Sequence, residues 1–135
     1  MLSRDLETSL HLAFVKASAA RHEFITVEHL LLALLDNPTV MGVLRRHAVN
    51  IENLRQNLQE FLRDNVPVAP GTDEVDVQTA YGFQRVVQRA IGRVQITSDD
   101  ETEVTGAKVL AAILDEKDSH AAYFLRQQRV KLSAW

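Results

Sequence analysis

The sequence contains no cysteine, and this absence excludes several kinds of chemistry. A chain without thiols has no disulfide framework, no thiolate nucleophile and no zinc site with cysteine ligands. It also has only five glycines, and no stretch fits the G-x-x-x-x-G-K-[ST] pattern of a P-loop. No glycine-flanked serine resembles the nucleophile elbow of a hydrolase. We therefore expect a non-catalytic protein that binds no ATP through a P-loop.

Basic charge and long apolar runs are also scarce. The formal net charge is -3, so there is no overall basic field of the kind that attracts nucleic acid. No apolar run reaches the ~18 residues that a membrane-spanning helix needs. The first ten residues, MLSRDLETSL, carry acids and lack the apolar centre of a signal peptide. These features predict a cytoplasmic, soluble protein that binds neither nucleic acid nor membranes.

What the sequence does contain is helical periodicity. Apolar residues recur at helical spacing from the start, at Leu6, Leu10, Ala13, Phe14 and Ala17. Polar residues that favour helix N-caps precede successive apolar stripes, at Ser3, Thr26, Asn37 and Asn50. Residues 64–79 contain four acids, two prolines and no basic residue, which predicts a surface connection. We expect no strand partner for its valines, with a short extended piece as the alternative. A second acidic loop is predicted over 97–103, with Asp99 and Asp100 as solvated charges.

The two halves of the chain repeat each other, segment by segment and in the same order. Leu10, Ala13 and Ala17 recur in the second half as Val87, Ala90 and Val94. Thr26, Leu31, Ala33, Leu35 and Asp36 recur as Thr105, Leu110, Ala112, Leu114 and Asp115. Leu44, Arg45 and Val49 recur as Leu125, Arg126 and Val130. The offset is constant inside each helix and grows slightly from one helix to the next, as insertions in loops would produce.

The repeat predicts an all-α fold in which two four-helix units are related by a pseudo-twofold axis and share one core. Repeat one covers about 1–63, an acidic linker about 64–78 and repeat two about 79–135, together forming a single domain. In repeat two, Leu132 matches Ile51 and Trp135 matches Leu54, so the eighth helix is truncated. We expect these last residues to fray.

Two clusters of polar residues are candidates for chemistry. His22, Glu23, Glu28 and His29 could hold a divalent metal, although capping or a surface role explains them equally well, and we expect no biological metal site. Arg85, Arg89 and Arg93 recur every four residues along the fifth helix, opposite its apolar stripe. This spacing indicates either a solvated basic face or a docking stripe for an acidic partner surface.

Three segments together resemble the N-terminal domain of Clp/Hsp100 ATPases. They are RHEFITVEHLLLALLDNP at 21–38, FQRVVQRAIGRVQ at 83–95 and EVTGAKVLAAILDEKDSHAAYFLRQQ at 103–128. The match is most similar to the ClpA-type branch and covers essentially the whole chain. The family fold is an eight-helix, pseudo-twofold, all-α domain, in agreement with the repeat.

The resemblance implies a mobile module above an ATPase ring. Such a domain binds the small adaptor ClpS, which hands over substrates with destabilising N-terminal residues (N-degrons) for proteolysis by ClpP. It can also contact unfolded substrates directly. The ATPase modules, with their ATP and Mg²⁺, would lie beyond residue 135, so this chain is expected to be an excised, monomeric domain without a cofactor of its own.

Carried over by motif, the resemblance nominates Glu23, Glu28, Arg85 and Arg89 as adaptor-binding residues that supply charge complementarity and orientation. The segment TAYG at 79–82 departs from the polar run typical of the family, so contacts from it are not carried over. The alternative is a ClpB- or ClpC-type domain, or a free-standing relative, that binds unfolded protein or another adaptor through the groove between the repeats.

Overall fold

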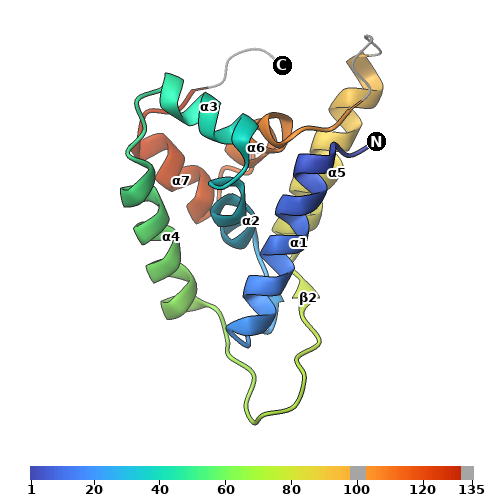
Figure 1. Cartoon of the computed structure of the whole chain (residues 1–135), viewed down its shortest axis with the longest axis vertical. Coiled ribbons are helices and arrows are strands. Elements are labelled where there is room, and N and C mark those ends of the chain that lie inside the picture. The colour runs from blue at the N-terminus through green and yellow to red at the C-terminus, as the bar shows by residue number, and fades with distance from the viewer. Residues whose placement is uncertain (98–102, 132–135) are drawn as a thin grey trace.

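The computed structural model describes residues 1–97 and 103–131 and consists mainly of helices (Figure 1). The first half contains α1 (Arg4–Ala19), β1 (Phe24–Ile25), α2 (Val27–Leu34), α3 (Pro38–Arg46) and α4 (Ile51–Asn65). The second half contains β2 (Gln78–Thr79), α5 (Tyr81–Thr97), α6 (Gly106–Leu114) and α7 (His120–Gln127). Residues 98–102 of the loop predicted over 97–103, and the predicted eighth helix from Leu132 onward, lie outside the described residues.

The predicted helix starts are confirmed by their hydrogen bonds. The Ser3 hydroxyl accepts from the Leu6 backbone N–H at 3.1 Å, and the Asn50 side chain accepts from Asn53 at 3.0 Å. Asn37 accepts from the N–H groups of both Thr39 and Val40, with Pro38 as the first residue of α3. Each polar side chain satisfies a donor that the first helical turn leaves without a partner, which fixes where the helix begins.

Helices α2 and α6 occupy the centre of the molecule, with the other helices packed around them (Figure 1). Every residue of α2 is buried, and in α6 only Lys108 and Leu114 are not. Both are apolar on almost all sides, which is typical of a helix surrounded by protein. Because α2 comes from the first half and α6 from the second, the two halves share one core.

The pseudo-twofold relation is confirmed by reciprocal pairing of the segments that precede the helices. Ile25, before α2, pairs in parallel with Thr79, before α5. Leu2, before α1, forms a parallel bridge with Val104, before α6. In the repeat, Leu2 occupies the position equivalent to Thr79, and Ile25 occupies the position equivalent to Val104. The two pairs are therefore equivalent to each other. Each half therefore completes the other.

The ends of α3 and α7 repeat as well. Ala48 and Arg129, at equivalent positions of the two repeats, both adopt positive φ, at 55° and 61°. In each case the next residue donates its N–H to a carbonyl in the last helical turn, from Val49 to Leu44 and from Val130 to Leu125, both at 3.1 Å. This is the hydrogen-bond pattern that ends a helix with a left-handed residue.

The acidic connection after α4 is irregular, as predicted, but the expectation that its valines have no strand partner is wrong. Val68 forms an antiparallel bridge with His22. The guanidinium of Arg21 also donates to the carbonyls of Ala69, Pro70 and Asp73, at 3.3, 3.1 and 2.7 Å. The bridge and these bonds hold the connection against the end of α1. Because these residues are far apart in the sequence, a local pattern does not predict the contact.

Within residues 1–97 and 103–131, no single helix has the length and apolar character to cross a membrane. Helices α2 and α3 satisfy those criteria only when taken together, and they are joined at a bend of 86°.

Candidate docking surface

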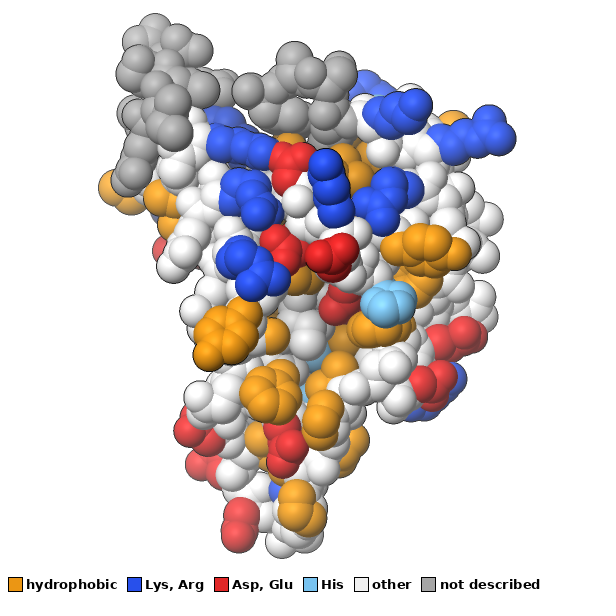
Figure 2. All heavy atoms as spheres, turned by 180° about the vertical axis from the view of Figure 1, so that it is seen from behind, with side chains coloured by type: hydrophobic (Ala, Val, Ile, Leu, Met, Phe, Trp, Pro, Cys, Tyr) orange, Lys and Arg blue, Asp and Glu red, His pale blue; other side chains and the backbone are white. Residues whose placement is uncertain are grey.

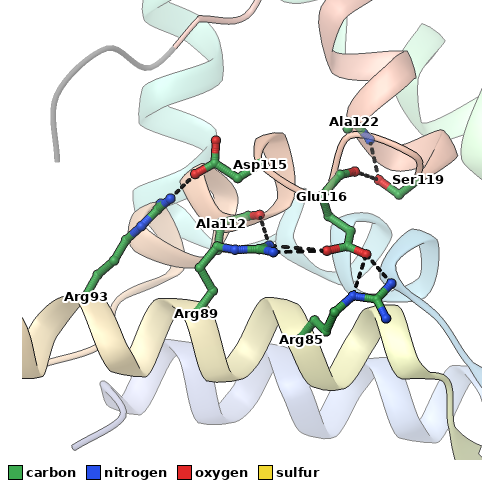
Figure 3. A network of polar contacts seen from close by, with 8 residues as sticks. All are labelled: Arg85, Arg89, Arg93, Ala112, Asp115, Glu116, Ser119 and Ala122. Atoms are coloured by element: carbon green, nitrogen blue, oxygen red, sulfur yellow. Dashed lines mark hydrogen bonds and ion pairs between the residues drawn. The ribbon is translucent and has the colours of Figure 1, made fainter.

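The turn between α6 and α7 holds a carboxylate that two arginines contact, with a third arginine nearby. Glu116 is only 8% exposed, and it lies beside the flank of α5 that carries Arg85, Arg89 and Arg93 (Figure 3). Arg85 forms an ion pair with Glu116 in which its Nε donates at 2.9 Å. Arg89 donates to the other Glu116 oxygen at 3.3 Å and to the Ala112 carbonyl at 3.2 Å. Arg93 pairs with Asp115.

These pairs change the interpretation of the basic stripe. The arginines lie on the flank of α5 that faces α6 and the following turn, rather than opposite the apolar stripe, and all three pair with acids of this chain (Figure 3). A purely solvated basic face is therefore wrong. The hydrogen bond from Arg85, with support from Arg89, lowers the pKa of Glu116 against the opposing effect of burial, so the carboxylate is charged at neutral pH.

Glu28 links the first repeat to the second. The residue is 6% exposed, and its Oε2 accepts from the backbone N–H of Ala121 at 2.9 Å. Ala121 lies in the first turn of α7, where Ser119 accepts from the N–H of Ala122 at 3.0 Å. Glu28 thus caps a helix that begins in the other half of the chain, and its negative charge lies at the positive end of that helix.

The parts of α2, α5 and the α6–α7 turn described above enclose a depression of about 260 Å³. We call it the docking depression; it is lined by Thr26, Val27, Glu28, Ala80, Gly82, Arg85, Glu116, Asp118, Ser119 and His120. The structure thus brings the predicted residues Glu28 and Arg85 together, with Arg89 adjacent through Glu116. Figure 2 shows one face of the molecule on which basic side chains gather around acidic ones, with apolar side chains next to them.

Glu23, the fourth predicted residue, lies just outside this depression. Its side chain is partly exposed, and it lines a neighbouring hollow together with Phe24, Asp76 and Gln78. Its backbone is fixed from both sides, since its N–H donates to Pro67 at 2.9 Å and its carbonyl accepts from Gln78 at 3.0 Å. The β1–β2 pairing therefore holds Glu23 in a defined position.

Sequence reasoning missed three residues of this region. Glu116 was not singled out, because its pairing with Arg85 and Arg89 depends on how α5 packs against the turn after α6. Phe24 and Tyr81 are large hydrophobic residues that are 41% and 79% exposed. Tyr81 lies in the TAYG segment, directly between two residues that line the docking depression.

The residues weighed as a metal site form a hydrogen-bonded pair of histidines instead. His22 Nδ1 and His29 Nε2 are 2.8 Å apart, and His29 Nδ1 accepts from the Thr26 backbone N–H at 3.0 Å. His29 completes a capping box with Thr26, so the capping role considered for it is confirmed. In the described part of the chain, no three histidine or acidic side chains are grouped closely enough to hold a metal ion.

Comparison with known proteins identifies the family. The Clp repeat (R) N-terminal domain profile matches residues 1–128. This chain belongs to that family. A ClpA homolog protein from Fuscovulum blasticum is 43% identical to this Clp repeat domain over 127 residues, covering 93% of the chain but only 16% of the relative. The chain therefore spans about a sixth of the length of that curated relative.

Solved structures share the fold of this Clp repeat domain. The N-terminal domain of Hsp104 from Candida albicans superposes with a TM-score of 0.77 at 16% identity, covering 96% of this chain and 83% of that one. The N-terminal domain (1–163) of the ClpV1 ATPase from E. coli EAEC Sci1 T6SS gives 0.74 at 21% identity, covering 94% and 76%. These neighbours confirm the predicted all-α Clp N-domain fold.

Proposed function

We propose that this Clp repeat domain is the adaptor- and substrate-docking module of a ClpA-type unfoldase, and that it binds a ClpS-type adaptor. The 43% identity to a ClpA homolog supports this branch of the family. In the whole protein the domain would deliver N-degron and other substrates for ATP-dependent proteolysis by ClpP. The domain itself would be non-catalytic and cytoplasmic, with ATP and Mg²⁺ used by other modules.

The observation that carries the proposal is the docking depression. Both repeats contribute to it, and three of its charged side chains, those of Glu28, Arg85 and Glu116, are fixed before any partner arrives. Arg85 and Arg89 are held by Glu116, and Glu28 is held by the start of α7. A surface that is already ordered loses little conformational entropy on binding, which favours a specific interface of modest size. The exposed rings of Phe24 and Tyr81 supply apolar contact area nearby.

The four predicted residues take different roles in this proposal. Arg85, whose side chain is 57% exposed, and the partly exposed Glu23 would contact the adaptor directly. Glu28 is buried, so it would act by fixing α7 at the edge of the depression. Arg89 would act mainly by holding Glu116 in place. A partner surface that presents a cation near Glu23 and an acid near Arg85 would fit this arrangement.

Calorimetric titration with ClpS tests the proposal. Glu23→Arg and Arg85→Glu should each weaken binding by about 1–3 kcal/mol, with the larger loss for whichever residue lies nearer the centre of the interface. Two matched variants serve as controls. Glu60→Arg reverses an exposed charge on α4, and Arg93→Glu removes an ion pair one turn or more from the depression. The proposal fails if the folded domain shows no heat with ClpS at tens of micromolar, or if the control variants weaken binding as much as the test variants.

A second candidate is a ClpB- or ClpC-type domain that binds unfolded protein or another adaptor directly. One similar structure, with a TM-score of 0.77 and 21% identity, is described as a peptide from the EAEC T6SS Sci1 SciI protein, and this favours direct peptide binding. Titration with an unfolded model protein in the absence of ClpS separates the two candidates. Binding of that protein at similar affinity, without binding of ClpS, would favour the second.

A further inference from the structure

A second pocket lies on a different part of the molecule. It has a volume of about 390 Å³ and is lined by residues near the C-terminal ends of α1 and α4 and by residues of α2. Most of its wall is apolar and comes from Ala20, Leu32, Leu62 and Val68. It has no lining residue in common with the docking depression. Its volume falls within the range of small-ligand sites.

The histidine pair presents a hydrogen-bond donor at this pocket. Because the Thr26 N–H donates to Nδ1 of His29, the neutral ring carries its hydrogen on Nε2 and donates it to Nδ1 of His22. His22 must then carry its own hydrogen on Nε2. Among the described residues, every fully buried side-chain nitrogen or oxygen has a hydrogen-bond partner. His22 Nε2 has no such partner, since the hydrogen bond of this ring uses Nδ1. The Nε2–H group of His22 is therefore accessible to solvent. His22 is one of the residues that line the pocket.

Among the described residues, the lysine and arginine side chains that line the pocket are its only charged lining groups. Lys16, in the last turn of α1, and Arg63, near the end of α4, line it, and no aspartate or glutamate does. Arg63 pairs with Asp64 at 3.3 Å, but both side chains are well exposed, and exposed pairs of this kind contribute little. An apolar wall with two cations and an imidazole N–H suits a ligand that has an apolar body and one carboxylate.

Gln59 indicates what kind of carboxylate ligand fits. This residue also lines the pocket, and a glutamine side chain has both a donor and an acceptor. A peptide backbone has matching groups, whereas a fatty acid has none beyond its carboxylate. We propose that this pocket binds the C-terminal end of a polypeptide, with the last apolar side chains inside it and the α-carboxylate held by Lys16 and the Nε2–H of His22.

Fluorescence anisotropy with a labelled peptide that ends in Leu-Leu tests this inference. The free-acid peptide should bind the domain at least about tenfold more tightly than the same peptide with a C-terminal amide. Lys16→Glu should weaken binding of the free acid by about tenfold or more and leave binding of the amide unchanged. Arg45→Glu reverses a charge in the last turn of another helix, α3, away from the pocket, and should have no effect.

A second variant separates the apolar contribution. Ala20→Trp places a large ring at the exposed rim of the pocket and should weaken the binding of both the free-acid and the amide peptide. Equal affinity for acid and amide, or no binding by a domain that circular dichroism shows to be folded, would overturn the proposal. Displacement of the peptide by octanoate at lower concentrations than by unlabelled peptide would assign the pocket to a fatty acid instead. Because the two sites share no residue, Lys16→Glu should bind ClpS normally, so failure here leaves the adaptor proposal standing.

Discussion

At the scale of single residues, His29 links stability to pH. It is 4% exposed, and burial together with the neighbouring His22 lowers its pKa from 6.5 to about 4. Between those two values the unfolded chain binds a proton that the folded chain does not, so the stability present above pH 6.5 is lost as the pH falls toward 4. Because a shift of one pKa unit corresponds to about 1.4 kcal/mol, the loss is on the order of 3 kcal/mol. Urea unfolding at pH 7, 5.5 and 4.5 measures it.

Glutamine at position 29 is the matched test of this assignment. Its amide oxygen can still accept the Thr26 N–H, as glutamine does in a capping box, but it does not titrate. We expect His29→Gln to lower the free energy of unfolding at pH 7 by about 1 kcal/mol, through the lost bond to His22. The loss of unfolding free energy on acidification should shrink to the part that His22 contributes. The pKa of His22 is also lowered by burial. An unchanged acid-dependent loss would contradict the role given to His29.

Two glycines offer a paired test of packing between the repeats. A Cβ at Gly106 would lie 2.9 Å from Cγ and Oδ1 of Asn37, the residue that caps α3. A Cβ at Gly92, on α5, would meet nothing within 4 Å. We expect Gly106→Ala to destabilise the protein by about 1–3 kcal/mol and Gly92→Ala to stabilise it by up to about 1 kcal/mol. Thermal unfolding of both variants checks the opposite signs; a shift in the same direction would refute the packing argument.

At the scale of elements, the glutamate in α2 supports the start of α7. Replacing Glu28 by alanine leaves the buried N–H of Ala121 without its acceptor, which should cost about 1–3 kcal/mol. Glu28→Gln keeps an oxygen in place and loses only the charge, so it should cost less. Chemical unfolding compares the two variants, and hydrogen exchange at the first turn of α7 should rise more in the alanine variant. Equal exchange in both variants would show that the carboxylate does not cap the helix.

Helix starts and the repeat could be predicted because their signals are local. Thr26 and Thr105 each precede an apolar run, and each caps a central helix in the structure. The surroundings of Glu28 could not be predicted in this way. Its position in the first turn of a short helix suggests a surface site, but α2 is buried on every side, and its partner in α7 is distant in the sequence.

The interpretation of Arg85, Arg89 and Arg93 as a solvated basic face is wrong for a related physical reason, whereas their interpretation as a docking stripe stays a prediction. Their spacing correctly places three cations on one side of α5, but the acids that pair with them follow α6, a different helix further along the chain. Periodicity describes one helix, and the pairing depends on how two helices pack. The assignment of Glu23, Glu28, Arg85 and Arg89 to adaptor binding remains a prediction for the titrations to decide.

At the scale of the whole molecule, neither repeat buries its own core. The central helices α2 and α6 come from different halves, and Leu2 and Ile25 pair with Val104 and Thr79 of the other half. A fragment containing one repeat would expose the apolar surface that normally faces its counterpart, and half a chain of this size retains too little core to compensate.

Cutting the chain within the acidic connection, at Gly71, tests this interdependence. This glycine has a φ of 82° and lies in an exposed part of the connection between the two halves. We expect fragments 1–71 and 72–135 to show weak helicity and no cooperative thermal transition when separate. Mixed at equal concentration, they should recover helical circular dichroism and a transition whose midpoint rises with concentration, since association would then be part of folding. Cooperative unfolding of either fragment alone would mean that the repeats are independent units, and the shared core would no longer explain why both are present.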